Sequence, residues 1–397
     1  MKARVIYFVP LVLTASLVLA TCTANGGSIY ATIENEQKVS VSQLSVNSAS
    51  TLVIADIAKA AANGPYYVAA GAVYQGTLTG STVTSSSISW DPNALSPSTY
   101  RPYNPKGTDG TFMLCNSLVE FEGNLYGGFY TASGAQVGLY IAPASNPVTA
   151  NWTAVSGFPA GEQVVLLRVA NTTLFIVGTS GSYTTYDLYR VNTTTTTATA
   201  TISGLNKVTG IAWDGFNYFM SVGTATTGSK VYKSASPAGL NPGSDVTPTL
   251  ASGDQINSIF GAGGYIFVAT GVVPIGTNIA SGIFYSNTQG ASWSNVVAPV
   301  VSSVTIPLLC VAGPIDTNAD YLVGSDGYSY FTLNLNGTPA LTRYSDTTVA
   351  LYAESVSSIL VDTTHVLMGT NANGLWGAEF AGGASSSLAT GTTWIHE

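Results

Sequence analysis

The chain of 397 residues carries few charges, since only 8% of its residues are charged whereas 46% are hydrophobic. Its 42 glycines, its 22 tyrosines and its long runs of Ser and Thr exclude a disordered chain or a helical coil and are typical of β-sheet proteins. The formal net charge of −8 disfavours nucleic acid and anionic lipid surfaces as partners.

Residues 1–21 read as a leader peptide. Lys2 and Arg4 come first, and an apolar stretch of 16 residues follows, from Val5 to Ala20. This stretch is shorter than the ~20 residues that a membrane-spanning helix needs. Cys22 comes directly after the leader. The alternative is an ordinary secretory signal cut after Ala20, which would leave Cys22 unmodified.

The segment Leu19-Ala20-Thr21-Cys22 resembles the lipobox of bacterial lipoproteins, and Thr21 before the cysteine fits the looser lipoboxes of spirochaetes. The resemblance implies an extracytoplasmic, membrane-anchored protein, on the periplasmic side or at the cell surface. Cys22 would be its lipidated first residue, and residues 22–27 would be a short tether. Without the leader, 10 basic residues face 20 acidic ones, a net charge of −10. Membrane attachment would then depend on the lipid.

Seven apolar runs, each closing on a glycine or a tight turn, recur along the rest of the chain. They are 66–71, 125–128, 174–178, 218–223, 265–271, 321–324 and 366–369. Their closing glycines are 45 to 57 residues apart, a spacing that suits the four-stranded blade of a propeller. We predict an all-β, seven-bladed β-propeller over residues 28–397, with four antiparallel strands per blade and with these runs as second strands. Eight blades is the alternative, if residues 28–50 form a blade of their own.

The strand expected at residues 28–33 lacks partners nearby in the sequence. We expect it to pair with the last blade near residues 374–380 and so to close the ring, which removes an exposed sheet edge.

Four of the six tryptophans share one place in the repeat, where we expect fourth strands to begin and indoles to wedge between blades: Trp90, Trp152, Trp293 and Trp394. Before two of them, Ser286–Trp293 and Ser387–Trp394 keep the Ser, Gly and Trp of the pattern S-x-D-x-G-x-T-W. They resemble degenerate Asp-box (BNR) repeats, with Thr288 and Ala389 in the place of the Asp. The chain is thus similar to bacterial propeller lipoproteins with such repeats, a resemblance that implies no substrate.

Connections from second to third strands, and from one blade to the next, lie on one face of a propeller, which we call the loop face. The longest such connection is 91–110. We expect a protein or glycan partner to bind this face without catalysis. The candidate binding residues are Tyr100, Arg101, Tyr103, Lys106, Tyr130, Tyr183, Asp326 and Tyr328. The alternative for the tyrosines of the long connection is that they cover the next blade.

Ionisable residues are too scarce for most catalytic sites. A sialidase needs three arginines around the substrate carboxylate, and the chain after the leader has only Arg101, Arg168, Arg190 and Arg343. The competing hypothesis is a glycan hydrolase of sialidase-like type, which would need two carboxylates converging at the axis.

Metal and cofactor sites are not expected either. Two histidines, His365 and His396, do not suffice for a histidine-rich metal centre. Cys115 and Cys310 are expected to be buried thiols, with a disulfide between them as the alternative.

Overall fold

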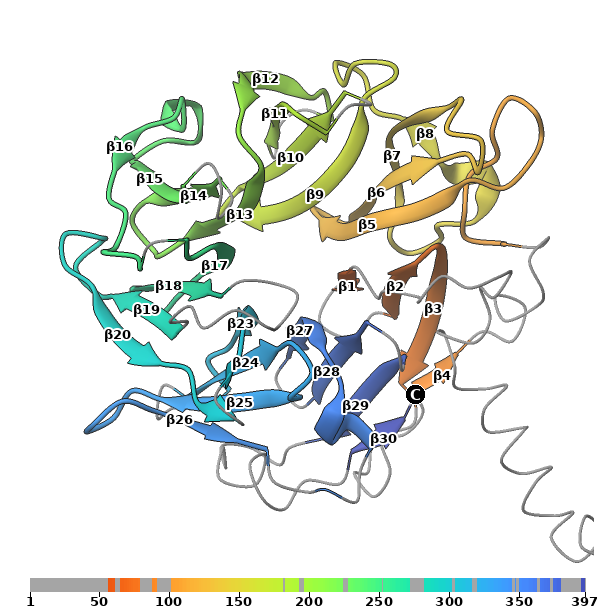
Figure 1. Cartoon of the computed structure of the whole chain (residues 1–397). Coiled ribbons are helices and arrows are strands. Elements are labelled where there is room, and N and C mark those ends of the chain that lie inside the picture. The colour runs from red at the N-terminus through yellow and green to blue at the C-terminus, as the bar shows by residue number, and fades with distance from the viewer. Residues whose placement is uncertain are drawn as a thin grey trace, which may run out of the picture.

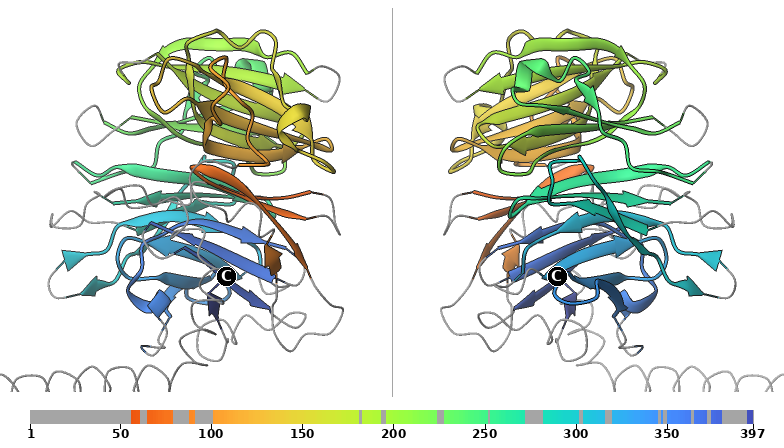
Figure 2. Two further views of the ribbon diagram at one scale, coloured as in Figure 1. Left: turned by 90° about the vertical axis from the view of Figure 1, so that its right-hand side faces the viewer. Right: turned by 90° about the vertical axis from the view of Figure 1, so that its left-hand side faces the viewer.

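The computed structural model describes residues 56–60, 65–78, 88–90, 101–180, 183–192, 196–223, 228–251, 253–271, 282–301, 304–315, 320–344, 347, 350–362, 365–371, 374–379 and 394–396. These residues form seven four-stranded antiparallel sheets around a common axis, which confirms the predicted seven-bladed propeller (Figure 1). Viewed edge-on, the sheets lie one above another across the ring (Figure 2).

Each blade is built from four strands that follow one another along the chain. Blades 1 to 4 comprise β1 (Asp56–Lys59), β2 (Tyr66–Ala70), β3 (Ala72–Leu78) and β4 (Ile88–Trp90); β5 (Leu114–Phe121), β6 (Asn124–Tyr130), β7 (Val137–Pro143) and β8 (Thr153–Ala154); β9 (Gln163–Ala170), β10 (Thr173–Thr179), β11 (Tyr186–Asn192) and β12 (Thr199–Leu205); β13 (Val208–Trp213), β14 (Tyr218–Val222), β15 (Lys230–Ser234) and β16 (Ser244–Asp245). Blades 5 to 7 comprise β17 (Ile256–Ala262), β18 (Tyr265–Thr270), β19 (Gly282–Ser286) and β20 (Ser294–Val297); β23 (Leu308–Ala312), β24 (Asp320–Ser325), β25 (Tyr330–Asn334) and β26 (Ala340–Arg343); β27 (Val356–Val361), β28 (His365–Thr370), β29 (Leu375–Glu379) and β30 (Ile395–His396).

Short elements outside the blades complete the described structure. A hairpin of β21 (Val300–Val301) and β22 (Val304–Thr305) joins blades 5 and 6, and three 3-10 turns are η1 (Thr149–Asn151), η2 (Pro237–Gly239) and η3 (Ala350–Ala353). Within the described residues, no helical segment is long and apolar enough to cross a membrane.

The seven apolar runs are the second strands β2, β6, β10, β14, β18, β24 and β28, as predicted. Every residue of β2, β10, β14, β24 and β28 is buried. A strand covered on both faces needs apolar or small residues at successive positions, which explains why the runs do not alternate with polar residues.

The first strands line the axis, and six of them share a β-bulge at the same place. One extra residue interrupts their pairing with the second strand: Asn116, Val165, Thr209, Asn257, Leu309 and Ser357. Bulges bend and twist a strand locally, so this repetition gives each inner strand a similar course where it enters the ring.

The apolar cores lie in the seams between sheets. Each of six buried clusters joins residues of neighbouring blades. Two of the glycines that close the apolar runs show why no side chain fits at these positions in the seams. A Cβ added to Gly128 would lie 2.7 Å from the Cβ of Val164, and one added to Gly324 would lie 2.3 Å from the carbonyl oxygen of Val356. In both cases the obstacle is the first strand of the next blade.

Three tryptophans wedge toward the preceding blade, as predicted. Each directly precedes a fourth strand, and each indole Nε1 donates a hydrogen bond: Trp152 to the carbonyl of Tyr103 at 3.0 Å, Trp293 to that of Val246 at 2.8 Å, and Trp394 to the hydroxyl of Tyr330 at 3.1 Å. Trp90 differs from the prediction, because it ends β4 instead of preceding it. The chain pairs Trp90 with Gly76 of β3, so the strand has already begun at Ile88.

The turn before Trp293 keeps a polar acceptor where the Asp-box pattern has aspartate. Thr288 Oγ1 accepts a hydrogen bond from Ser292 N at 2.9 Å, and Ser286 Oγ accepts one from Gly290 N at 3.0 Å. A hydroxyl oxygen thus satisfies a turn amide that would otherwise lack a partner.

The ring closes where blade 7 packs against blade 1 (Figure 1). β29, with which we expected the N-terminal strand to pair, is flanked by β28 on one side and, at Trp376 and Gly377, by β30 on the other. In the described residues blade 7 therefore takes all four strands from its own segment. The segment 28–33 lies outside the described residues, so ring closure by that strand stays a prediction.

Candidate functional site

The described part of the longest connection is fixed to the blades by a buried asparagine. Asn104 Oδ1 accepts a hydrogen bond from Val73 N at 2.8 Å, and its Nδ2 donates one to the carbonyl of Met113 at 2.8 Å. Its side chain is fully buried, so both bonds are shielded from water. The connection is held firmly between blades 1 and 2.

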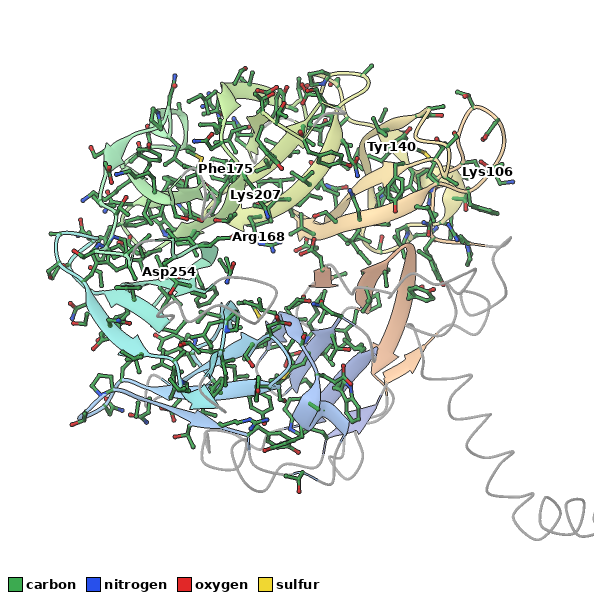
Figure 3. The ribbon with its side chains drawn as sticks, in the orientation of Figure 1. Lys106, Tyr140, Arg168, Phe175, Lys207 and Asp254 are labelled. Carbon is green, nitrogen blue, oxygen red and sulfur yellow. The ribbon has the colours of Figure 1, made fainter. Side chains whose placement is uncertain are left out.

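Three candidate residues of this connection have different outcomes. Tyr103 is buried, with 8% of its surface exposed, and belongs to the core. This burial leaves it little surface to offer a ligand, so we drop it from the candidate set. Lys106 is exposed, with its Nζ 4.9 Å from the centre of the Phe112 ring, and lies at the periphery of blade 2 (Figure 3). Tyr100 lies outside the described residues.

Arg101, Tyr130 and Tyr183 form a first loop-face cluster. Burial lowers the pKa of the Arg101 guanidinium, and the nearby Tyr74 and Tyr130 hydroxyls oppose that change. Burial also raises the pKa of Tyr130, and Tyr183 acts on it in the same direction. In the described residues, the Arg101 guanidinium has no carboxylate partner within ion-pair distance. The cluster therefore holds a partly desolvated cation beside phenol groups.

Tyr183 shows two unusual properties in the β10–β11 connection. Its φ of 52° lies in the left-handed region, which costs a non-glycine residue roughly 1 kcal/mol or more. Its side chain is 51% exposed although it is a large aromatic group. The hydroxyl donates a hydrogen bond to Gln163 Oε1, which fixes the direction of the ring. Strained, exposed and oriented side chains of this kind are typical of binding sites.

A second loop-face cluster lies across the ring, between blades 6 and 7, and comprises Asp326, Tyr328, Arg343 and Tyr352 (Figure 1). The Arg343 Cζ lies 4.8 Å from the centre of the Tyr328 ring and 4.1 Å from that of Tyr352. Asp326 Oδ1 accepts a hydrogen bond from Ser355 Oγ at 2.6 Å. The structure thus separates the predicted residues into two clusters instead of one continuous patch.

Neither Arg343 nor Tyr352 was among the candidate binding residues predicted from the sequence. Their position in the repeat could have pointed to them. Arg343 ends β26 and Tyr352 lies in η3, and both elements adjoin the loop face. The stacking could not be predicted, since it depends on how η3 folds back toward the β24–β25 connection.

The axial channel contains a cavity of about 370 Å³, lined only by first strands and their turns. Of its lining side chains, two are charged, Asp56 and Arg168, and they form an ion pair with Nη1 2.7 Å from Oδ1. Asp56 Oδ2 accepts hydrogen bonds from Ser117 Oγ at 2.6 Å and from Leu118 N at 3.1 Å. This network links blades 1, 2 and 3. A pair of carboxylates at the axis, which the hydrolase hypothesis requires, is not present among the described lining residues.

Two carboxylates do lie close together on blade 3, outside the channel. Burial, more than any other cause, raises the pKa of Glu162, and the negative charge of Asp187 raises it further. Glu162 Oε1 accepts a hydrogen bond from Tyr189 at 2.8 Å, and Asp187 Oδ1 accepts one from Gly204 N at 2.9 Å. Neither was among the predicted residues.

The two described cysteines, Cys115 and Cys310, are free thiols. Cys115 is buried, as expected for both, whereas Cys310 is half-buried. Burial raises the pKa of Cys310 to about 12, and that of Cys115 also lies above its ordinary value. Both thiols are therefore protonated at neutral pH and poor nucleophiles. Cys22, the predicted lipidation site, lies outside the described residues.

The sequence matches no known protein family and no curated protein. Its fold is similar to that of an extracellular domain of a putative hybrid two-component system from B. thetaiotaomicron, with a TM-score of 0.54 and 13% identity. The match covers 84% of this chain and 38% of the other. The fold is also similar to that of YCF48 bound to D1 peptide, with a TM-score of 0.53, 9% identity and coverage of 87% and 98%. At identities this low, the structural similarity shows a shared fold alone.

Proposed function

We propose that this protein is a lipid-anchored, extracytoplasmic propeller that binds a protein or glycan partner through its loop face without catalysis. The observation that carries the proposal is Tyr183, which is strained, half-exposed and oriented by Gln163 near Tyr130, itself a neighbour of Arg101. Aromatic rings with few rotatable bonds and a nearby cation supply contact area at low entropic cost. Asn104 and the seam packing hold these groups in place before a partner arrives.

The two similar folds agree with this class of function. One belongs to an extracellular domain, and the other was solved with a peptide bound. A glycan hydrolase is the competing hypothesis. The carboxylate pair that it requires at the axis is absent from the described lining residues, so Glu162 and Asp187 on blade 3 are the carboxylates left to test. Hydrolysis of a glycan panel that is lost in Glu162→Gln would favour the hydrolase.

The loop-face proposal is tested by replacing Arg101 and Tyr183 together with alanine in the full chain. We expect the double variant to lose capture of partners found in a glycan and protein binding screen, because the cation and the exposed ring are both removed. Binding should fall by about tenfold or more, since two central contacts are lost.

The matched control is Phe216→Ala. Phe216 is 63% exposed in the β13–β14 turn, which lies on the face opposite the loop face. This control should bind as the wild type does. Unchanged capture by the double variant, with an unchanged melting temperature, would show that this cluster is not the binding site.

The anchor is tested separately by metabolic labelling with palmitate. We expect label in the wild type and none in Cys22→Ala, because the thiol is the acceptor of the lipid. Cys310→Ala serves as the control. The Cys310 thiol is protonated and is not expected to accept the lipid, so its removal should leave labelling intact. An unlabelled wild type would contradict the lipoprotein proposal and leave the loop-face proposal standing.

A further inference from the structure

The axial cavity offers a second, independent place for a ligand. It holds about 370 Å³ and is lined by first strands from all seven blades. Its lining residues are mostly aliphatic, with Trp213 and Phe260 as aromatic groups and serines from blades 5 and 7, but polar atoms form more of its exposed surface than apolar ones do. A concave cavity of this size with a few placed polar groups is typical of small-molecule sites.

Arg168 is the cation of this cavity and lies at the inner rim of blade 3 (Figure 3). Its side chain is 43% exposed, whereas that of Asp56 is 11% exposed. Only Nη1 has described partners, Asp56 Oδ1 at 2.7 Å and the carbonyl of Leu167 at 2.7 Å. The Nη2 and Nε groups therefore have no partner among the described residues. An arginine held at one nitrogen presents its other edge in a fixed direction.

Asp56 is fully engaged by the protein. Besides Arg168, it accepts hydrogen bonds from Ser117 Oγ and Leu118 N, and Ser117 Oγ in turn accepts one from Leu167 N at 3.1 Å. These donors stabilise the carboxylate in addition to the ion pair. Because these donors also stabilise Asp56, the carboxylate does not depend on Arg168 alone. The guanidinium can therefore bind a second carboxylate as well.

In two other blades a small side chain occupies the position of Arg168. Arg168 lies three residues after the bulge of its strand, and the same position holds Ala212 in blade 4 and Ala312 in blade 6, whereas blade 5 has Phe260 there. Both alanines line the cavity. Hydroxyl groups come from Ser258 and Ser358, the residues directly after the bulges of β17 and β27. The cavity thus combines a cation, serine hydroxyls and aromatic residues.

We propose that the axial channel binds a small hydroxylated carboxylic acid, such as a sugar acid, with its carboxylate on the free edge of Arg168. Its hydroxyls would hydrogen-bond to Ser258 and Ser358, and its apolar ring face would lie against Trp213 or Phe260. This site does not depend on the loop-face clusters. Because Asp56 shares the cation and the whole chain is acidic, we expect a dissociation constant that is roughly millimolar.

The test is calorimetric titration of the full chain with D-glucuronate and with D-glucose, which has the same ring without the carboxylate. We expect glucuronate to bind at least about tenfold more tightly than glucose, and chloride to weaken glucuronate alone. The variant Arg168→Lys keeps a cation that can pair with Asp56 but lacks the second nitrogen edge. It should bind glucuronate about tenfold more weakly than the wild type.

Arg190→Gln is the matched control, because it removes one positive charge from β11, outside the cavity. It should bind glucuronate as the wild type does. The proposal is overturned if glucuronate does not bind, if it binds no better than glucose, or if a folded Arg168→Lys variant keeps the wild-type affinity. A circular dichroism melt shows whether that variant is folded.

Discussion

The seam that closes the ring differs in chemistry from the seams between consecutive blades. Between consecutive blades, neutral side chains of first strands reach the backbone of the next blade, as Asn116 Nδ2 does to the carbonyl of Val164 at 2.7 Å and Asn257 Nδ2 to that of Leu308 at 2.8 Å. Between blades 7 and 1, Lys59 Nζ lies 2.7 Å from Asp362 Oδ2, with side-chain exposures of 14% and 12%.

The closing seam gathers further groups around Asp362. The Tyr66 hydroxyl and the His365 amide both donate hydrogen bonds to its carboxylate. Burial, followed by the bond to Asp362, raises the pKa of Tyr66. Consecutive blades are already joined by the chain, and the seams at Asn116 and Asn257 are aligned by neutral hydrogen bonds. Between blades 1 and 2 the Asp56 carboxylate contributes as well. Within the described residues the first and last blades have no such link, and a charged, well-bonded cluster fixes how they meet.

The largest effect is expected for Asp362→Ala, which removes the acceptor of this cluster. It leaves the Lys59 charge buried without its partner and should lower the free energy of unfolding by about 3–5 kcal/mol, as measured by urea denaturation. The control is Lys230→Ala, which breaks the Lys230–Asp245 pair at 50% and 46% exposure and should cost far less stability, because water screens an exposed pair. Equal losses in the two variants would show that the closing seam has no special role.

A second buried carboxylate, at the start of blade 5, is expected to lower the stability at neutral pH, whereas Asp362 raises it. Asp254 precedes β17 with 4% of its surface exposed, and burial raises its pKa from 3.8 to about 6. The folded state then binds the proton more tightly than the unfolded state, so stability is full below about pH 4 and declines as the pH rises through 6.

Asp254→Asn should therefore stabilise the protein above pH 6, by about 2 kcal/mol after allowance for solvent screening, and should change little near pH 4. Chemical denaturation at both pH values measures the difference. If Asp254→Asn lowers the free energy of unfolding equally at both pH values, the hydrogen bonds to the carboxylate stabilise the protein by more than its burial costs.

The smallest of these effects is expected for Asn257→Ala in the seam between blades 5 and 6. The change removes hydrogen bonds from Nδ2 to the carbonyls of Gly271, at 2.9 Å, and Leu308. It should lower the free energy of unfolding by about 1–2 kcal/mol in a thermal or urea melt. A loss as large as that of Asp362→Ala would erase the contrast between the two kinds of seam.

The propeller and its second strands could be predicted because their burial on both faces leaves continuous apolar runs in the sequence. The wedging tryptophans followed from their position in the repeat. Contacts between distant residues could not be predicted, since Asp56 meets Arg168 and Lys59 meets Asp362 only after the ring has formed. Tyr103 shows the same limit, because a tyrosine in a proline-containing connection fits either a binding surface or a cover for the next blade. The structure shows that Tyr103 packs.

The contiguity of each blade has a mechanical consequence. In the described residues, no backbone ladder runs between the first and last blades, so tension applied to the two chain ends would act on side chains alone at that junction. Among the described residues, the junction between Lys59 and Asp362 is therefore the place where we expect the ring to open first under such tension.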